Sequence, residues 1–74
     1  MRLLSDSFSQ VVKKHRERKG LSKASLAEGS SLHQTYIGLL ERGLRSPNLD
    51  TAKSIAKALG LTLGEMITEA ERDM

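Results

Sequence analysis

Residues 20–43 read GLSKASLAEGSSLHQTYIGLLERG, and this stretch decides the fold of the chain. It predicts two short helices joined by a tight turn. Ser22 can cap the first helix, because a serine oxygen accepts a hydrogen bond from a backbone N–H of the opening turn. The run Gly29-Ser30-Ser31 breaks that helix, since glycine and serine favour turns. Gly43 can end the second helix, expected over about residues 33–42, in the left-handed conformation that glycine adopts at low cost.

The second helix of this pair has an inner and an outer face. Leu32, Ile37 and Leu40 are spaced to lie on the inner face. The outer face carries four other residues: Gln34, Thr35, Gly38 and Leu39. Glutamine can bond N6 and N7 of adenine, and a threonine methyl can touch a thymine methyl, so this face suits base reading in a major groove. A solvated helix face fits the pattern as well, because helix-turn-helix shapes also occur as packing units.

Motifs continue on both sides of the turn: G-L-S-x-x-x-L-A at 20–27, T-Y-I-x-x-x-E-R-G at 35–43, P-x-L at 47–49 and I-A-x-A-L-G at 55–60. Together they resemble the Cro/repressor (XRE-type) helix-turn-helix family, whose restriction–modification controller proteins also carry T-Y-I-G and E-R-G. Small phage repressors share this lean build. The resemblance implies a single all-α, five-helix, lambda-repressor-like domain over residues 1–74, with the helix-turn-helix at about 22–42. It also implies a homodimer that binds double-stranded DNA at a palindromic operator.

The resemblance assigns roles to individual residues. It implies an ion pair between Arg16 and Glu41, which would pin the first helix to the recognition helix. It also implies phosphate contacts from polar residues around the helix-turn-helix: Ser22, Lys23, His33, Tyr36, Arg42, Arg45 and Ser46.

Three residues depart from the family pattern. Lys23 replaces the usual glutamine, so it would meet phosphate as a point charge. His33 stands where Ser, Thr or Asp usually caps the recognition helix, and we expect it to be a poorer cap. Ser31 replaces the usual turn glycine, which costs about 1 kcal/mol if this position needs a positive φ.

A first helix is expected over about residues 7–19. Ser7 and Gln10 form a possible capping box at its start. Four residues fall on one face of this helix: Phe8, Val11, Val12 and His15. We interpret His15 as a half-buried structural residue, because His33, the other histidine, is too distant in sequence for metal ligation at helical spacing.

Two more helices follow the recognition helix. Asn48 is a good cap for the fourth, whose apolar residues repeat at helical spacing: Leu49, Ala52, Ile55, Ala56 and Leu59. Thr62 and Glu65 form a possible capping box that opens a fifth helix at about 62–72. Its apolar residues Leu63, Met66 and Ile67 are expected to remain partly exposed, and an exposed apolar patch usually marks a partner surface. We therefore predict the dimer interface there.

Composition and charge favour a DNA-binding protein. The chain has 74 residues, of which 38% are hydrophobic, and it has no cysteine. Residues 1–60 hold 11 Lys and Arg against 5 Asp and Glu, whereas the last fourteen residues hold one against four. A basic body attracts a polyanion. Without cysteine and without an apolar run long enough to span a membrane, we expect a cytoplasmic protein.

The leading interpretation is a sequence-specific DNA-binding transcriptional regulator. The alternative is an antitoxin-like subunit of a toxin–antitoxin pair, whose main partner would be another protein docked on the fifth helix. An enzyme is not expected, because the sequence has no clustered catalytic residues and no glycine-rich phosphate loop. No cofactor, metal or small-molecule ligand is expected either.

Overall fold

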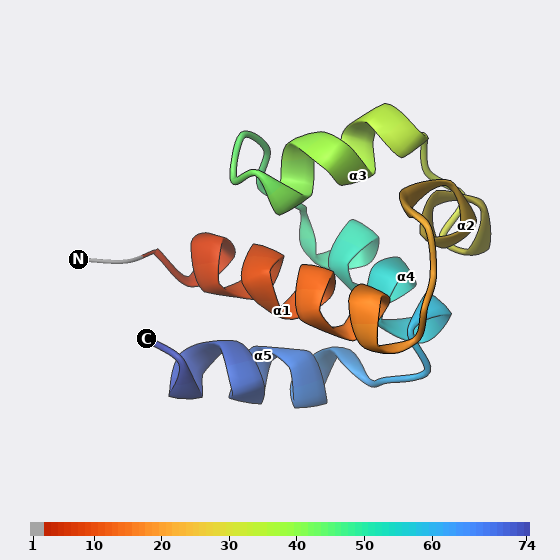
Figure 1. The fold of residues 1–74 in the computed structure, drawn as a ribbon. Helices are drawn as coiled ribbons and strands as arrows, with labels where there is room; N and C mark the ends of the chain where they lie inside the picture. Colours follow the sequence, from red (N-terminus) through yellow and green to blue (C-terminus); the bar gives the residue numbers. More distant parts are fainter. Residues whose placement is uncertain (1–2) are drawn as a thin grey trace.

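The computed structural model describes residues 3–74, and these form five α-helices and no β-strand. The helices are α1 (Leu4–Arg18), α2 (Lys23–Gly29), α3 (Gln34–Glu41), α4 (Leu49–Ala58) and α5 (Leu63–Arg72). Figure 1 shows α1 and α5 side by side, with α3 on the opposite side of α1 from α5. α2 packs against α3 and α4, while α4 also contacts α5. The expected all-α, five-helix class is confirmed.

Polar caps fix the starts of three helices as predicted. The Ser22 side chain accepts a hydrogen bond from the Ser25 N–H at 3.0 Å, which caps α2. Asn48 Oδ1 accepts from the Thr51 N–H at 2.8 Å at the start of α4. Thr62 and Glu65 form the complete capping box of α5.

The predicted start of α1 is wrong. α1 begins at Leu4, and the Leu3 carbonyl oxygen accepts hydrogen bonds from the N–H groups of Asp6 and Ser7. Ser7 is therefore an interior helix residue rather than a cap. Its hydroxyl is buried and has no hydrogen-bond partner among residues 3–74. The sequence could not indicate this start, because leucine has no side-chain acceptor with which to mark a cap.

One aliphatic core lies between the helices. Its buried side chains are Phe8, Val11, Val12, Leu26, Ala27, Ile37, Leu40, Ala52, Ile55, Ala56, Leu59, Met66 and Ala70. Leu49, the first residue of α4, is 76% exposed although it belongs to the apolar repeat of that helix. One prediction about an individual residue is wrong: Met66 is fully buried, so it cannot contact a partner subunit, whereas Leu63 and Ile67 are half-buried.

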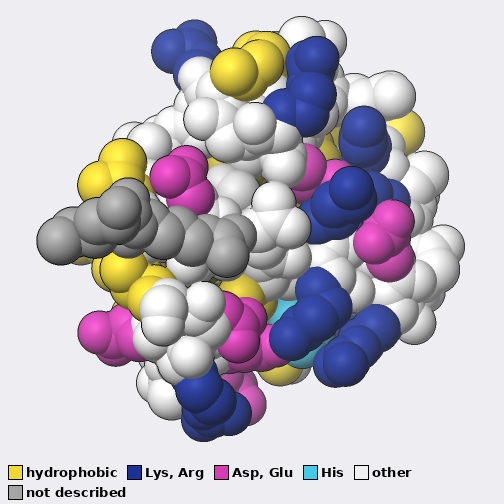
Figure 2. Space-filling model, turned by 60° about the vertical axis from the view of Figure 1, so that its left-hand side comes forward, with side chains coloured by type: hydrophobic (Ala, Val, Ile, Leu, Met, Phe, Trp, Pro, Cys, Tyr) yellow, Lys and Arg dark blue, Asp and Glu magenta, His cyan; other side chains and the backbone are white. Residues whose placement is uncertain are grey.

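Charged side chains are unevenly distributed on the surface. On the face shown in Figure 2, most Lys and Arg side chains gather on the right, and exposed hydrophobic side chains lie mainly on the left. The large exposed apolar residues are Leu3, Leu4, Leu44, Leu49 and Met74. On this face, most basic side chains and most exposed hydrophobic side chains therefore lie apart.

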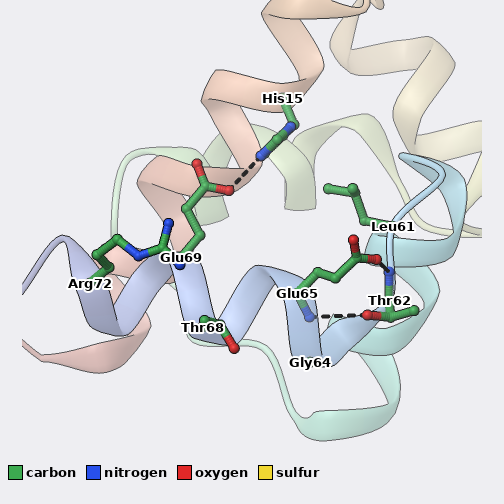
Figure 3. Close-up of a pocket in the computed structure, with 8 residues that line it drawn as sticks. All are labelled: His15, Leu61, Thr62, Gly64, Glu65, Thr68, Glu69 and Arg72. Carbon is green, nitrogen blue, oxygen red and sulfur yellow. Dashed lines mark hydrogen bonds and ion pairs between the residues drawn. The ribbon is translucent and has the colours of Figure 1, made fainter.

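A polar cluster joins α1 to α5. His15 Nε2 lies 2.7 Å from Glu69 Oε2, and Lys14 forms an ion pair with the same carboxylate. Figure 3 shows His15 and Glu69 pointing toward each other from the two helices. The hydrogen bonds from His15 and Lys14 lower the pKa of Glu69 to about 2. His15 is half-buried, as the sequence predicted, and it contacts a carboxylate of another helix.

We predict that Glu69→Gln makes the protein less sensitive to acid. The pKa of Glu69 in the folded protein is below its ordinary value of 4.5. Its stabilising contribution is therefore complete above about pH 4.5 and is lost as the pH falls toward 2. Thermal melts across this range should show a smaller decline for Glu69→Gln than for the wild type. Glu71→Gln, an exposed residue of the same helix, should behave like the wild type. Identical declines in all three proteins would contradict the prediction.

Candidate nucleic-acid interface

The turn between α2 and α3 sets the angle between these helices. The buried Ser30 hydroxyl donates to the Leu26 carbonyl oxygen at 2.7 Å, and the Leu32 N–H donates to the Ala27 carbonyl oxygen at 2.8 Å. Ser31, between them, has a φ of 59°. This is the left-handed region that favours glycine. Position 31 therefore does need a positive φ, which is the condition under which the sequence predicted strain at Ser31.

The outer face of α3 presents the four residues that the sequence singled out. Gln34 and Thr35 are exposed at its first turn, and Gly38 and Leu39 are half-buried one turn later. Ile37 and Leu40 are fully buried on the inner face. One short helix thus presents an amide, a hydroxyl with its methyl group, and apolar surface on a single face.

An ion pair fixes α3 against α1. Arg16 Nε donates to Glu41 Oε2 at 2.7 Å, and Arg16 Nη2 donates to Glu41 Oε1 at 3.0 Å. Arg16 Nη1 donates to the Leu21 carbonyl oxygen at 2.9 Å, so the guanidinium also holds the loop before α2. Only 11% of the Arg16 side chain and 3% of the Glu41 side chain are exposed. The hydrogen bonds to Glu41 raise the pKa of Arg16, so its guanidinium stays charged.

Four of the predicted phosphate contacts lie before or within the first turn of α3. Lys23 is exposed at the start of α2, beside the cap residue Ser22. His33 is exposed immediately before α3, and within residues 3–74 its side chain caps no backbone N–H, in line with the expected poorer cap. Tyr36 is half-buried and packs on the core. Lys23 and His33 are therefore free to meet a ligand, whereas part of the Tyr36 ring is held by the protein.

The other three candidates follow α3. Arg42, Arg45 and Ser46 are all exposed, in the segment that leads to α4. Arg42 Nε donates to the Gly38 carbonyl oxygen at 3.2 Å, so this guanidinium lies back along the helix. Cationic and polar groups thus flank the outer face of α3 at both of its ends.

A shallow apolar groove of about 150 Å³ lies where α1, α4 and α5 meet. It is lined by Leu4, Ser5, Phe8, Pro47, Leu49, Ala52 and Ile67. Of the three residues predicted for the dimer interface, only Ile67 lines this groove. Sequence periodicity placed Leu49 in the apolar repeat of the fourth helix but did not indicate its place in this groove. Its position directly after the cap residue Asn48 is the signal that could have indicated exposure.

The geometry described so far matches known proteins. A family model described as helix-turn-helix matches residues 12–66. The chain belongs to the XRE-type helix-turn-helix family. It is 37% identical over 65 residues to control protein C.SmaI of Serratia marcescens, a match that covers 88% of this chain and 77% of that protein.

Solved structures in this family have the same fold. The clp gene regulator ClgR of Corynebacterium glutamicum superposes with a TM-score of 0.92 at 28% identity, covering 100% of this chain and 96% of that one. The restriction–modification controller protein C.Esp1396I, bound to a 25 base pair operator site, superposes with a TM-score of 0.84 at 31% identity. That match covers 97% of this chain and 99% of that one.

The described part of the chain holds neither a candidate metal site nor a candidate membrane-spanning helix. Among residues 3–74, no group of three or more His, Asp or Glu side chains is placed to hold a metal ion. None of the five helices is long and apolar enough to cross a membrane.

We predict that Glu41→Gln and Arg16→Met each lower the melting temperature sharply. Removing one partner leaves the other charge buried and unpaired, which costs about 3–5 kcal/mol, a large share of the stability of a small domain. Thermal and urea unfolding measure this effect. Arg18→Met, an exposed residue of the same helix, is the control and should melt near the wild-type temperature. Wild-type stability in either of the first two variants would show that the pair does not brace the fold.

Proposed function

We propose that this protein is a sequence-specific DNA-binding transcriptional regulator that binds a palindromic operator as a homodimer. The observation that carries the proposal is the exposed outer face of α3, braced against α1 by Arg16 and Glu41. The similarity to C.Esp1396I, which was crystallised with its operator, supports it.

In this proposal α3 enters the major groove. Gln34 and Thr35 stand at its first turn, where the side chains of a recognition helix reach base edges. Gln34 is suited to adenine, and the Thr35 methyl to a neighbouring thymine. Gly38 and Leu39 continue the same face one turn further along.

Cationic and polar residues around α3 would hold the DNA backbone. Lys23 and His33 precede α3 in the chain, and Arg42, Arg45 and Ser46 follow it. Contacts to phosphate fix the register of a protein on the duplex but carry no sequence information. Ser22 and Tyr36 complete the proposed set, Tyr36 through the part of its ring that the core leaves exposed.

The apolar groove would be covered by a second copy of the chain. Leu49, which lines the groove, is 76% exposed, and Leu44, in the segment before Pro47, is 63% exposed. Exposed apolar side chains of this kind in a small domain usually mark a partner surface. Leu63 and Ile67 are half-buried and remain in the proposed interface, whereas Met66 is buried and is left out of it. The domain measures 31 × 23 × 22 Å, so the centres of two copies side by side would be separated by a distance of the same order as one turn of DNA, about 34 Å.

The specific role that we propose is control of restriction–modification genes. Support comes from the similarity to C.SmaI and to C.Esp1396I, both controller proteins by name. The antitoxin-like alternative is not favoured, since C.SmaI, ClgR and C.Esp1396I are all regulators. Footprinting on the promoter of a neighbouring methyltransferase or endonuclease gene tests this role, and a protected palindrome is the expected result.

We predict that Gln34→Ala loses affinity only on the operator. Base contacts discriminate between sequences, so the loss should be about 1–3 kcal/mol on the preferred duplex and almost nothing on a scrambled one. Titrations of an operator recovered by selection from random duplexes, and of its scrambled version, measure this. Lys23→Ala is the matched control. It should weaken both duplexes alike and reduce the log–log salt slope by about one. Equal losses on both duplexes for Gln34→Ala would show that α3 does not read bases.

We predict that Leu49→Lys and Ile67→Lys, made separately, shift the protein from dimer to monomer in sedimentation experiments. Each variant places a charge against the apolar groove, which a second copy could cover only by desolvating that charge. Operator affinity should fall with dimerisation. Thr68→Lys, an exposed position on α5 that does not line the groove, is the control and should remain dimeric. Dimers of normal affinity in both groove variants would place the interface elsewhere.

A further inference from the structure

Gly38 is a glycine that the protein itself does not explain. It lies in the middle of α3, and the positive-φ glycines are Gly20, Gly43 and Gly60. Apart from the helix's own backbone and the two adjacent residues, no heavy atom of residues 3–74 lies within 4 Å of where its Cβ would stand. Gly29 differs, because its Cβ would meet the Ala58 Cβ at 3.5 Å where α2 packs on α4. Glycine is less favourable than alanine inside a helix, so the space over Gly38 has no structural purpose in the free protein.

This space is a notch on the outer face of α3. In a helix, residues three and four positions apart are neighbours on the surface. Gln34 and Thr35 therefore border the notch in the preceding turn, and Arg42 borders it in the following turn. The floor of the notch is the Gly38 backbone.

The polar group at this floor is already engaged. The Gly38 carbonyl oxygen accepts hydrogen bonds from both the backbone N–H and Nε of Arg42, each at 3.2 Å. The carbonyl oxygen at the floor cannot donate to a phosphate, so donors are found only in the side chains at the border of the notch. The floor of the notch is thus suited to a small apolar group. Among the groups that base pairs present in the major groove, the C5-methyl of thymine is the apolar one.

We propose that Gly38 is a specificity-determining residue whose missing side chain admits the C5-methyl of one thymine in each operator half-site. This proposal rests on the proposed function, because it requires α3 in a major groove. Gln34 would bond the adenine of a nearby base pair, and the methyl group would enter the notch beside it. A Cβ at position 38 would occupy the same space as that methyl group.

Uracil substitution tests the proposal with the wild-type protein alone. An operator recovered by selection from random duplexes is remade with each thymine replaced in turn by uracil, which removes only the methyl group. Replacement of the sensitive thymine in a single half-site should weaken wild-type binding about 3- to 5-fold, the effect of exposing one buried methyl. If no uracil replacement changes wild-type affinity, the proposal is overturned.

Gly38→Ala provides the complementary change. It should bind the thymine operator about 10-fold more weakly, since the added Cβ overpacks a close contact. Uracil at the sensitive position should restore much of this loss, because the alanine methyl then takes the place of the thymine methyl. An unchanged affinity for the thymine operator, or a loss that uracil does not relieve, would overturn the proposal.

Gly64→Ala is the matched control. Gly64 is an exposed helix glycine whose Cβ would meet only Thr62 Oγ1, at 3.9 Å. Both alanine variants should melt about 2–5 °C above the wild type, because alanine favours the helix. Gly64→Ala should bind both operators like the wild type, and a loss there would show that stability, rather than the notch, controls affinity. If the wild type selects no duplex at all, the proposed function itself fails. If it selects an operator but binds every uracil variant equally well, only the proposal about Gly38 fails.

Discussion

The two-pronged ion pair between Arg16 and Glu41 is the interaction on which the proposed reading surface depends. It joins the end of α1 to the last turn of α3, and the third hydrogen bond of the guanidinium holds the loop that leads into α2. One side chain therefore fixes the position of both helices of the helix-turn-helix. A buried ion pair of this kind contributes geometry more reliably than net stability, since its desolvation opposes its attraction.

The segment between α3 and α4 serves two surfaces at once. Arg42, Arg45 and Ser46 are exposed and proposed to meet DNA, whereas Pro47 lines the apolar groove. This segment is short, so its two sets of side chains cannot move independently. Covering the groove with a second subunit would therefore also order the groups that meet phosphate. Dimerisation and DNA binding are then expected to be thermodynamically coupled.

Much of the fold could be predicted because its signals are local. Ser22, Asn48 and Thr62 each mark a helix start by a side chain that bonds a backbone N–H within the next turn. The outward face of α3 could be predicted for the same reason, since helical spacing separates Ile37 and Leu40 from the outward residues.

The remaining features depend on tertiary packing. Helical spacing shows which side of α4 and α5 is apolar, but it does not show where the core ends. Met66 was therefore predicted to be exposed although it is buried, and the apolar repeat of α4 did not show that Leu49 is 76% exposed. The cluster of Lys14, His15 and Glu69 joins residues more than fifty positions apart. Only the packing of α5 against α1 brings them together.

The half-buried position of Tyr36 has an optical consequence. The chain has one tyrosine and no tryptophan, so its intrinsic ultraviolet fluorescence, apart from the weak emission of Phe8, originates from the recognition helix. The ring packs partly on the core and is partly open to its surroundings. Its emission therefore senses both the docking of α3 onto the domain and the approach of a ligand to α3. The protein carries its own spectroscopic probe at this surface, without any label.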